Sequence, residues 1–211
     1  MNKIKVALFD FCKTLVKLNT LGEFVNFCLN NENLHIPNRN LKKFLIYIKP
    51  LLSRMKIYSS RQIEIKVLSG FTKDNLLKLG KEFYNFVIKP NFNAVVINEF
   101  YKLKKEGYYT VIISAALDVY LQYIIYDLPF DKIICTELIF DEKGVCLGKV
   151  KGIDPVATGK VNKLKSTLDF FNDIDFEHSY FFTDDPVGDI SLLKIVGNGF
   201  IVKNADIKRF N

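Results

Sequence analysis

The sequence is poor in the residues that bind transition metals or build disulfide frameworks. Its 211 residues include two histidines, four cysteines and no tryptophan. The cysteines are Cys12, Cys28, Cys135 and Cys146, and none of them form a C-x-x-C pair. This spacing disfavours a zinc site. Free thiols in a chain without a recognisable secretion signal indicate a reducing compartment, so we expect a cytoplasmic protein.

Long hydrophobic runs are also absent. No apolar run reaches the ~18 residues that cross a bilayer, so the sequence predicts no integral membrane protein, and we expect no membrane partner. The first apolar run, Ile4–Phe9, is short and ends on Asp10 without a small-residue cleavage site, which does not fit a signal peptide.

The net charge is positive, and the basic residues are spread along the chain. Lys and Arg outnumber Asp and Glu by 30 to 23, a net charge of +7. The lysines form no run of five or more, and no repeat combines aromatic residues with arginine, so we expect no nucleic-acid partner. A basic surface of this kind suits a small anionic ligand.

Short apolar, β-branched runs recur along the chain with helical patterns between them. The expected strands are Ile4–Phe9, Tyr108–Ser114, Lys132–Glu137, Tyr180–Thr183 and Gly199–Val202. Because these runs do not alternate polar and apolar residues, both faces of the sheet should be covered. The expected helices Phe92–Glu106, Lys160–Phe171 and Ile190–Val196 alternate with them. The pattern predicts an α/β fold, a doubly wound (Rossmann-like) parallel sheet.

Two stretches interrupt this alternation. Residues 18–89 contain only amphipathic helical patterns and are too long for an ordinary crossover, so we expect a helical insertion after the first strand. We therefore predict a core domain of residues 1–17 and 90–211 and a helical cap domain of residues 18–89. In Glu137–Lys151, the turn sequence Asp141–Gly144 separates two short apolar segments, which predicts a β-hairpin after the third strand.

Polar residues follow the expected strands at one edge of the sheet. Asp10 follows the first strand, Ser114 ends the second, and Asp184 and Asp185 follow the fourth. Ligands of open parallel sheets bind beyond the carboxyl ends of the strands. Lys160, which opens the helix before the fourth expected strand, can reach the same edge.

These residue types suit phosphoryl transfer. Carboxylates are hard oxygen ligands for Mg²⁺, a lysine neutralises a phosphoryl group, and a carboxylate can act as nucleophile. Taken singly, each residue also has a structural explanation, because Asp and Ser commonly cap helices or form turns and lysines are commonly solvated. Only their order and their placement at strand ends favour a site.

Four segments resemble the motifs of the haloacid dehalogenase superfamily. They are Leu8–Val16 (LFDFCKTLV), Val111–Tyr120 (VIISAALDVY), Gly159–Leu164 (GKVNKL) and Phe182–Leu193 (FTDDPVGDISLL), in the family's order. The insertion resembles a type-I cap, and the hairpin is similar to that of the phosphoserine-phosphatase-like branch, subfamily IB. The resemblance implies an Mg²⁺-dependent phosphatase that acts on a small phosphorylated metabolite through an aspartyl-phosphate.

The resemblance also implies roles for the residues of the first two motifs. Asp10 matches the nucleophile, which also binds Mg²⁺, and Thr14 matches the closing hydroxyl of its motif. Ser114 matches the phosphate-holding residue, helped by the N–H of Ala115.

For the last two motifs, Lys160 matches the lysine that pairs with nucleophile and phosphate, although Lys163 lies one turn away. Asp185 matches the metal-binding carboxylate and Asp189 the second acid. Asp184 stands where the family usually has Gly or Ser, and both Asp184 and Asp189 are further candidate metal ligands.

The first motif departs from the family pattern D-x-D-x-T at Cys12. The family uses the main-chain carbonyl at this position for the metal, which Cys12 retains, but the missing carboxyl is the family's general acid. A thiol with an ordinary pKa of about 8.5 is a poor replacement, and loss of a general acid–base typically costs ~10²–10⁴ in rate. A structural thiol is the alternative interpretation of Cys12, and a catalytically degenerate protein that binds a phosphorylated ligand without turnover is the alternative function.

Further departures concern the substrate. Asn19 replaces the acidic residue that phosphoserine phosphatases carry nine positions after the nucleophile, and Ala115 and Ala116 replace two glycines, which disfavours phosphoserine. Asn19, Arg39, Arg54 and Arg61 are the cap residues that could face an anionic substrate. Relatives that cleave C–halogen or C–P bonds also lack the second Asp, but dehalogenation needs no metal and would not require Asp185 and Asp189.

Overall fold

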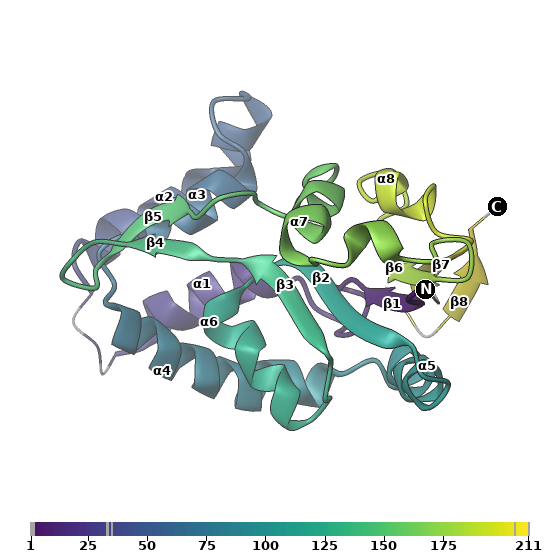
Figure 1. Ribbon diagram of the computed structural model, residues 1–211. Coiled ribbons are helices and arrows are strands. Elements are labelled where there is room, and N and C mark those ends of the chain that lie inside the picture. The colour runs from purple at the N-terminus through teal and green to yellow at the C-terminus, as the bar shows by residue number, and fades with distance from the viewer. Residues whose placement is uncertain (1–2, 33, 35, 205, 211) are drawn as a thin grey trace.

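A computed structural model of the chain describes residues 3–32, 34, 36–204 and 206–210. Its centre is a six-stranded sheet in the order β3-β2-β1-β6-β7-β8 (Figure 1). The strands are β1 (Val6–Phe9), β2 (Tyr109–Leu117), β3 (Lys132–Thr136), β6 (Tyr180–Thr183), β7 (Asn198–Lys203) and β8 (Asp206–Arg209). Neighbouring strands are parallel except β8, which is antiparallel to β7.

Helices cover both faces of this sheet, which explains its continuous apolar strands. Val6 and Leu8 of β1 belong to the core on the side of α7 (Gly159–Thr167) and α8 (Ile190–Leu193). Ala7 and Phe9 belong to the core on the opposite side, which includes residues of α5 (Ala94–Lys105) (Figure 1). Side chains of β1 that point to either face of the sheet are therefore all buried. This arrangement confirms the predicted α/β class with a doubly wound sheet.

Four helices lie between β1 and α5 in the described chain. They are α1 (Thr20–Asn30), α2 (Arg39–Arg54), α3 (Ser60–Val67) and α4 (Lys73–Phe83), and π-helical and 3₁₀ turns at Tyr84–Ile88 and Lys89–Asn91 follow them. The chain leaves and re-enters the sheet domain at one point, where the N–H of Lys17 donates to the carbonyl of Asn91 at 3.0 Å. The predicted cap boundaries, 17/18 and 89/90, fall beside this contact.

The predicted hairpin is present as a separate two-stranded sheet. Strands β4 (Leu138–Phe140) and β5 (Cys146–Val150) are antiparallel, and Gly144 adopts a φ of +73° in the turn between them. The hairpin also pairs with the segment between α3 and α4 of the insertion, because the N–H of Gly70 donates to the Cys146 carbonyl and the N–H of Cys146 to the Phe71 carbonyl, each at 2.8 Å. Core and insertion are therefore joined by main-chain hydrogen bonds as well as by the two linkers.

Several element boundaries differ from the sequence prediction. β2 does not end at Ser114 but continues to Leu117, with a register shift between Ile113 and Leu117. α7 stops at Thr167, before the expected Phe171. The expected helix at Ile190–Val196 ends at Leu193, and β8 was not predicted, because its charged sequence lacks an apolar run. Among the described residues, none of the helices has the length and apolarity to cross a membrane.

Candidate active site

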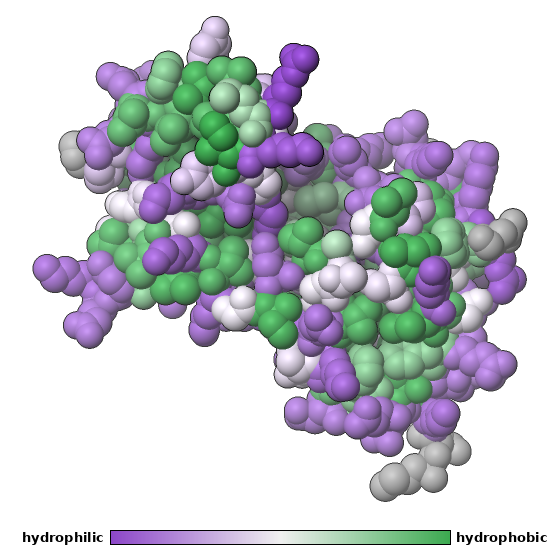
Figure 2. All heavy atoms as spheres, turned by 90° about the horizontal axis from the view of Figure 1, so that it is seen from above, coloured by the Kyte–Doolittle hydropathy of each residue, from purple (hydrophilic) through white to green (hydrophobic). Residues whose placement is uncertain are grey.

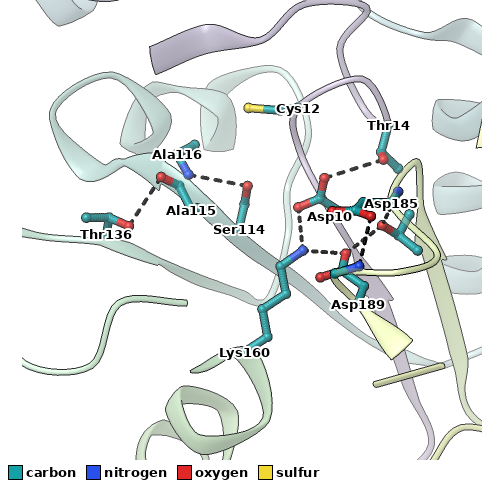
Figure 3. A network of polar contacts seen from close by, with 12 residues as sticks. Asp10, Cys12, Thr14, Ser114, Ala115, Ala116, Thr136, Lys160, Asp185 and Asp189 are labelled. Atoms are coloured by element: carbon teal, nitrogen blue, oxygen red, sulfur yellow. Dashed lines mark hydrogen bonds and ion pairs between the residues drawn. The ribbon is translucent and has the colours of Figure 1, made fainter. Parts of the chain in front are cut away.

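Asp10 occupies the carboxyl end of the central strand β1. Its N–H donates to the Phe182 carbonyl of the neighbouring strand at 2.9 Å, which extends the sheet pairing by one residue and fixes the side chain at the sheet edge. The carboxyl group is buried, with 6% of the residue exposed. Its Oδ1 accepts a hydrogen bond from Lys160 Nζ at 2.8 Å, and its Oδ2 lies 3.5 Å from Thr14 Oγ1 (Figure 3).

Lys160 is a buried ammonium held between two carboxylates. Besides Asp10, its Nζ donates to Asp189 Oδ2 at 2.6 Å, and Thr183 Oγ1 donates to the same oxygen at 2.5 Å. Burial by itself would lower the pKa of Lys160, but the charges of Asp10 and Asp189 outweigh it and the pKa is raised. Lys160 therefore stays charged at physiological pH.

Ser114 lies where the strand β2 becomes irregular. The register shift after Ile113 turns the chain so that Ser114, Ala115 and Ala116 line the same cavity as Asp10. The Ser114 hydroxyl accepts the N–H of Ala116 at 3.3 Å, which leaves its own proton for another acceptor. Figure 3 shows Ser114 and Asp10 on neighbouring strands, beside the Lys160 ammonium.

The loop after β6 brings two more carboxylates to this cavity. Asp184 and Asp185 both line it, and Asp185 Oδ1 accepts the N–H of Gly188 at 2.8 Å. A Cβ at Gly188 would lie 2.3 Å from Asp185 Oδ2, so a larger residue at this position would displace the Asp185 carboxylate. Burial raises the pKa of Asp184 to about 6, with further contributions from the charges of Asp10 and Asp185 and an opposing one from Lys13.

The carboxylates at this edge of the sheet are candidate ligands for a divalent cation. The electrostatic coupling of Asp184 to Asp10 and Asp185 indicates excess negative charge at this edge, and carboxylates are the ligands that Mg²⁺ prefers. Within the part of the chain that the structure describes, no three or more His, Cys, Asp or Glu side chains are grouped so as to enclose an ion. Asp10, Asp184 and Asp185 nevertheless line one cavity, and one or two carboxylates with water and phosphate are a common ligand shell for an ion such as Mg²⁺.

Cys12 lines the cavity beside Asp10 and is held by hydroxyl groups. Its Sγ lies 3.1 Å from Thr20 Oγ1, which in turn lies 3.0 Å from the Tyr120 hydroxyl. Burial raises the pKa of the Cys12 thiol to about 11, and the charge of Asp10 acts in the same direction. The thiol is therefore protonated at neutral pH.

The cavity, about 490 Å³ in volume, lies between the sheet edge and the helical insertion. Asn19 lines it, as do Lys49 of α2 and Arg61 and Glu64 of α3. Lys49 Nζ pairs with Glu64 Oε1 at 2.6 Å, and Arg61 pairs with Asp154 of the core at the rim. One wall of the cavity is thus made by the insertion.

The structure brings together most of the residues predicted from the sequence, but not all. Asp10, Cys12, Asn19, Ser114, Ala115, Lys160, Asp184, Asp185 and Asp189 line the cavity, and Thr14 lies behind Asp10. Arg39 and Arg54 do not line it. Arg39 donates to the carbonyls of Asn31 and Leu34 after α1, and Arg54 is exposed at the end of α2. Lys163 pairs with Glu137 outside the cavity.

Sequence reasoning missed several polar residues of the site. Thr183, which donates to Asp189, was predicted only as the last residue of a strand, and Asp154, which accepts from Arg61, had no predicted role. One feature of the sequence could have drawn attention to the Lys49–Glu64 ion pair. Glu64 is the first acidic residue after a long basic stretch that contains Lys49. Nothing in the sequence pattern shows which helix face Lys49 occupies.

The comparison with protein families gives the class of the protein. The family described as haloacid dehalogenase-like hydrolase matches residues 7–194, which include all the residues that surround Asp10 and Lys160. The chain belongs to the haloacid dehalogenase-like hydrolases. No curated protein matches it.

Solved structures share the fold at low sequence identity. A protein of unknown function from Bordetella pertussis Tohama I is 20% identical with a TM-score of 0.76, covering 93% of this chain and 89% of that one. A phospho-aspartyl intermediate analogue of phosphoserine phosphatase is 22% identical with a TM-score of 0.63, covering 93% and 85%. A phosphoserine phosphohydrolase-like protein from Francisella tularensis is 20% identical with a TM-score of 0.62, covering 93% and 86%.

Proposed function

We propose that this protein is a phosphatase that hydrolyses a small phosphomonoester through a covalent aspartyl-phosphate on Asp10. The observation that carries the proposal is the contact between Asp10 Oδ1 and Lys160 Nζ at 2.8 Å, in a cavity that Ser114 also lines. A carboxylate nucleophile beside a buried positive charge, with hydrogen-bond donors across a cavity, is what transfer of a phosphoryl group requires.

The proposed reaction has two steps at Asp10. A carboxylate oxygen of Asp10 attacks phosphorus, the bond from phosphorus to the leaving oxygen breaks, and that oxygen takes up a proton. Water then attacks phosphorus, the bond to Asp10 breaks, and inorganic phosphate leaves. Lys160 offsets the negative charge of the phosphoryl group, while the Ser114 hydroxyl and the N–H of Ala115 donate to its oxygens.

We assign the metal site to Asp10, Asp185 and the main-chain carbonyl of Cys12, with Asp184 as a further candidate. When bound, Mg²⁺ supplies positive charge that polarises the phosphoryl oxygens. Asp189 is better suited to positioning Lys160, because its Oδ2 already accepts hydrogen bonds from Lys160 and Thr183.

Residues 18–89 would act as a type-I cap of the subfamily IB kind, which selects the substrate through Asn19, Lys49 and Arg61. Two basic side chains in the wall favour an anionic, small phosphorylated metabolite. Phosphoserine is disfavoured, because Asn19 offers no charge to a substrate ammonium. The four free thiols are compatible with a cytoplasmic location.

A panel of sugar, amino-acid and nucleotide phosphates, incubated with the full chain and Mg²⁺, tests the proposal by release of inorganic phosphate. The matched control is Asp10→Asn, which keeps the size of the side chain and removes the nucleophile. We expect hydrolysis of at least one substrate class, reduced to background in the control. Turnover that is equal in both proteins, or absent from both, contradicts a phosphatase.

Cys12 supports a second candidate, a degenerate member that binds a phosphorylated ligand without turnover. A thiol is a weaker acid than the carboxyl that the family uses. Beryllofluoride, a mimic of the phosphoryl group, distinguishes the two. A melting shift with Mg²⁺ and beryllofluoride, together with no hydrolysis across the panel, would favour the binding function.

A further inference from the structure

Helix α2 exposes a stripe of large apolar side chains on the outside of the molecule. Leu41, Phe44, Tyr47, Leu51 and Met55 follow one another at helical spacing and are between 54% and 82% exposed. Ile57 and Tyr58, in the turn after the helix, are at least half exposed and continue the stripe. We call these seven residues the α2 stripe. Figure 2 shows hydrophobic side chains gathered over the part of the molecule formed by α2 and α3, with hydrophilic side chains around them.

The fold does not use this stripe. The opposite face of α2 makes the internal contacts, with Leu45, Ile46 and Leu52 packed against the core. The same inner face carries Lys42, which donates to the Ser69 carbonyl, and Lys49, which pairs with Glu64. Because α2 is already anchored by its inner face, its outer apolar stripe is available for another surface.

The segment that carries the stripe has basic residues and no acidic ones in its sequence. Residues 33–63 contain seven Lys or Arg and no Asp or Glu, a formal charge of +7 that equals the net charge of the whole chain. Lys43, Arg54 and Lys56 are exposed beside the stripe. Apolar residues bordered by lysine and arginine, without acidic residues, are the composition of helices that lie in a membrane interface.

We propose that the α2 stripe docks on an anionic lipid membrane, with α2 parallel to the surface and Lys43, Arg54 and Lys56 among the headgroups. The positive charge of this segment disfavours a second copy of the chain as the binding partner of the α2 stripe. Two such stripes packed face to face would bring the positive charges of both chains together without a carboxylate from this segment to pair with them. An anionic bilayer complements both the charge and the apolar side chains.

This proposal departs from the expectation from the sequence that the protein has no membrane partner. That expectation rested on the absence of a bilayer-spanning run, which says nothing about a helix that lies on the surface. Docking of α2 would also hold the cavity near the membrane surface, because Lys49 of α2 and Arg61 of α3 line that cavity. The proposal is independent of the chemistry at Asp10.

Sedimentation of the full chain with lipid vesicles tests the proposal. Vesicles of phosphatidylcholine with about 30% phosphatidylglycerol provide the anionic surface, and pure phosphatidylcholine vesicles the neutral one. We expect binding to the anionic vesicles that weakens as salt is raised, and at least about tenfold weaker binding to the neutral ones. Equal binding to both, or binding to neither, overturns the proposal.

Two matched variants locate the surface. Phe44→Ser/Leu51→Ser changes exposed residues of the stripe and should reduce vesicle binding by about tenfold or more. Phe86→Ser/Tyr126→Ser changes apolar residues elsewhere that are 75% and 81% exposed, and should leave binding unchanged. Equal losses in the two variants contradict the location. A dimer in sedimentation velocity that only Phe44→Ser/Leu51→Ser dissociates would assign the stripe to a second copy and overturn the membrane proposal.

Discussion

The guanidinium of Arg61, on helix α3, binds both carboxylate oxygens of Asp154 in the core. Its Nε donates to Oδ2 and one terminal nitrogen to Oδ1, each at 2.8 Å. The same nitrogen reaches Thr136 Oγ1 at the end of β3, also at 2.8 Å. This two-pronged contact joins the insertion to the core beside the cavity that Arg61 lines.

The contact should contribute measurably to stability. A two-pronged, partly buried arginine–carboxylate pair is stronger than an exposed ion pair. We expect a double-mutant cycle of Arg61→Met and Asp154→Asn to give a coupling free energy of about 1 kcal/mol in urea unfolding. The exposed Lys102–Glu99 pair serves as control and should give less than about 0.5 kcal/mol. Similar values for both pairs would contradict this assignment.

Lys160 and Lys163 are one helical turn apart and should differ sharply in function. Lys160→Ala removes the charge beside Asp10, so we expect phosphate release to fall by at least about 10²-fold in kcat. Lys163 pairs with Glu137 at 3.5 Å outside the cavity, and Lys163→Ala should retain activity within about twofold. Steady-state kinetics of both variants measure this difference in kcat. Comparable losses would mean that Lys160 has no special place in the reaction.

Replacement of Cys12 should restore the missing carboxyl. Cys12→Asp places an acid beside Asp10, and we expect turnover to rise by about 10²-fold, within the usual contribution of a general acid–base. Cys12→Ser is the control, because a hydroxyl has similar size and no comparable acidity, and it should show no increase. If Cys12→Asp turns over no faster than the wild type, the proton comes from another group.

Asp118, at the start of α6 (Asp118–Leu121), should make stability depend on pH. Its Oδ1 is buried without a hydrogen-bond partner in the described part of the chain, and burial raises its pKa from 3.8 to about 6. Between these values the unfolded chain loses a proton that the folded chain keeps, so stability falls as pH rises from about 4 to about 6.

Asp118→Asn removes this penalty. At pH 7 we expect the free energy of unfolding of the variant to exceed that of the wild type by about 1–2 kcal/mol. Near pH 3.5 we expect no gain, because Asp118 of the wild type is then mostly protonated in both the folded and the unfolded chain. Urea unfolding at the two pH values measures the difference. A variant that is equally destabilised at both values would indicate a packing role for Asp118 instead.

Sequence reasoning predicted the parts of this protein that depend on local patterns. The apolar runs Ile4–Phe9 and Tyr180–Thr183 predicted parallel strands, and because such strands end at one edge, the meeting of Asp10 with Asp184 and Asp185 followed. The irregular course of β2 after Ile113 was not predictable, since a register shift depends on tertiary contacts rather than on a residue period.

The helical insertion was harder to predict, because helical periodicity does not say which apolar face is buried. Arg39 and Arg54 were expected near the substrate as positive charges. Arg39 instead satisfies main-chain carbonyls after α1, and Arg54 is exposed. The sequence could show that α2 is amphipathic, but only the packing of its neighbours shows that one apolar face remains outside.

The pairing of hairpin β4–β5 with residues 70–73 constrains how a substrate can enter. If the insertion swung open about its linkers alone, the main-chain hydrogen bonds from Gly70 and Lys73 to the hairpin would break. A joint movement of insertion and hairpin would in turn separate Phe24 of α1 and Phe83 of α4 from Tyr120 of α6, whose ring both of them contact. The insertion is thus fixed to the sheet domain at two places, and a substrate should enter through the existing opening rather than by a hinge movement.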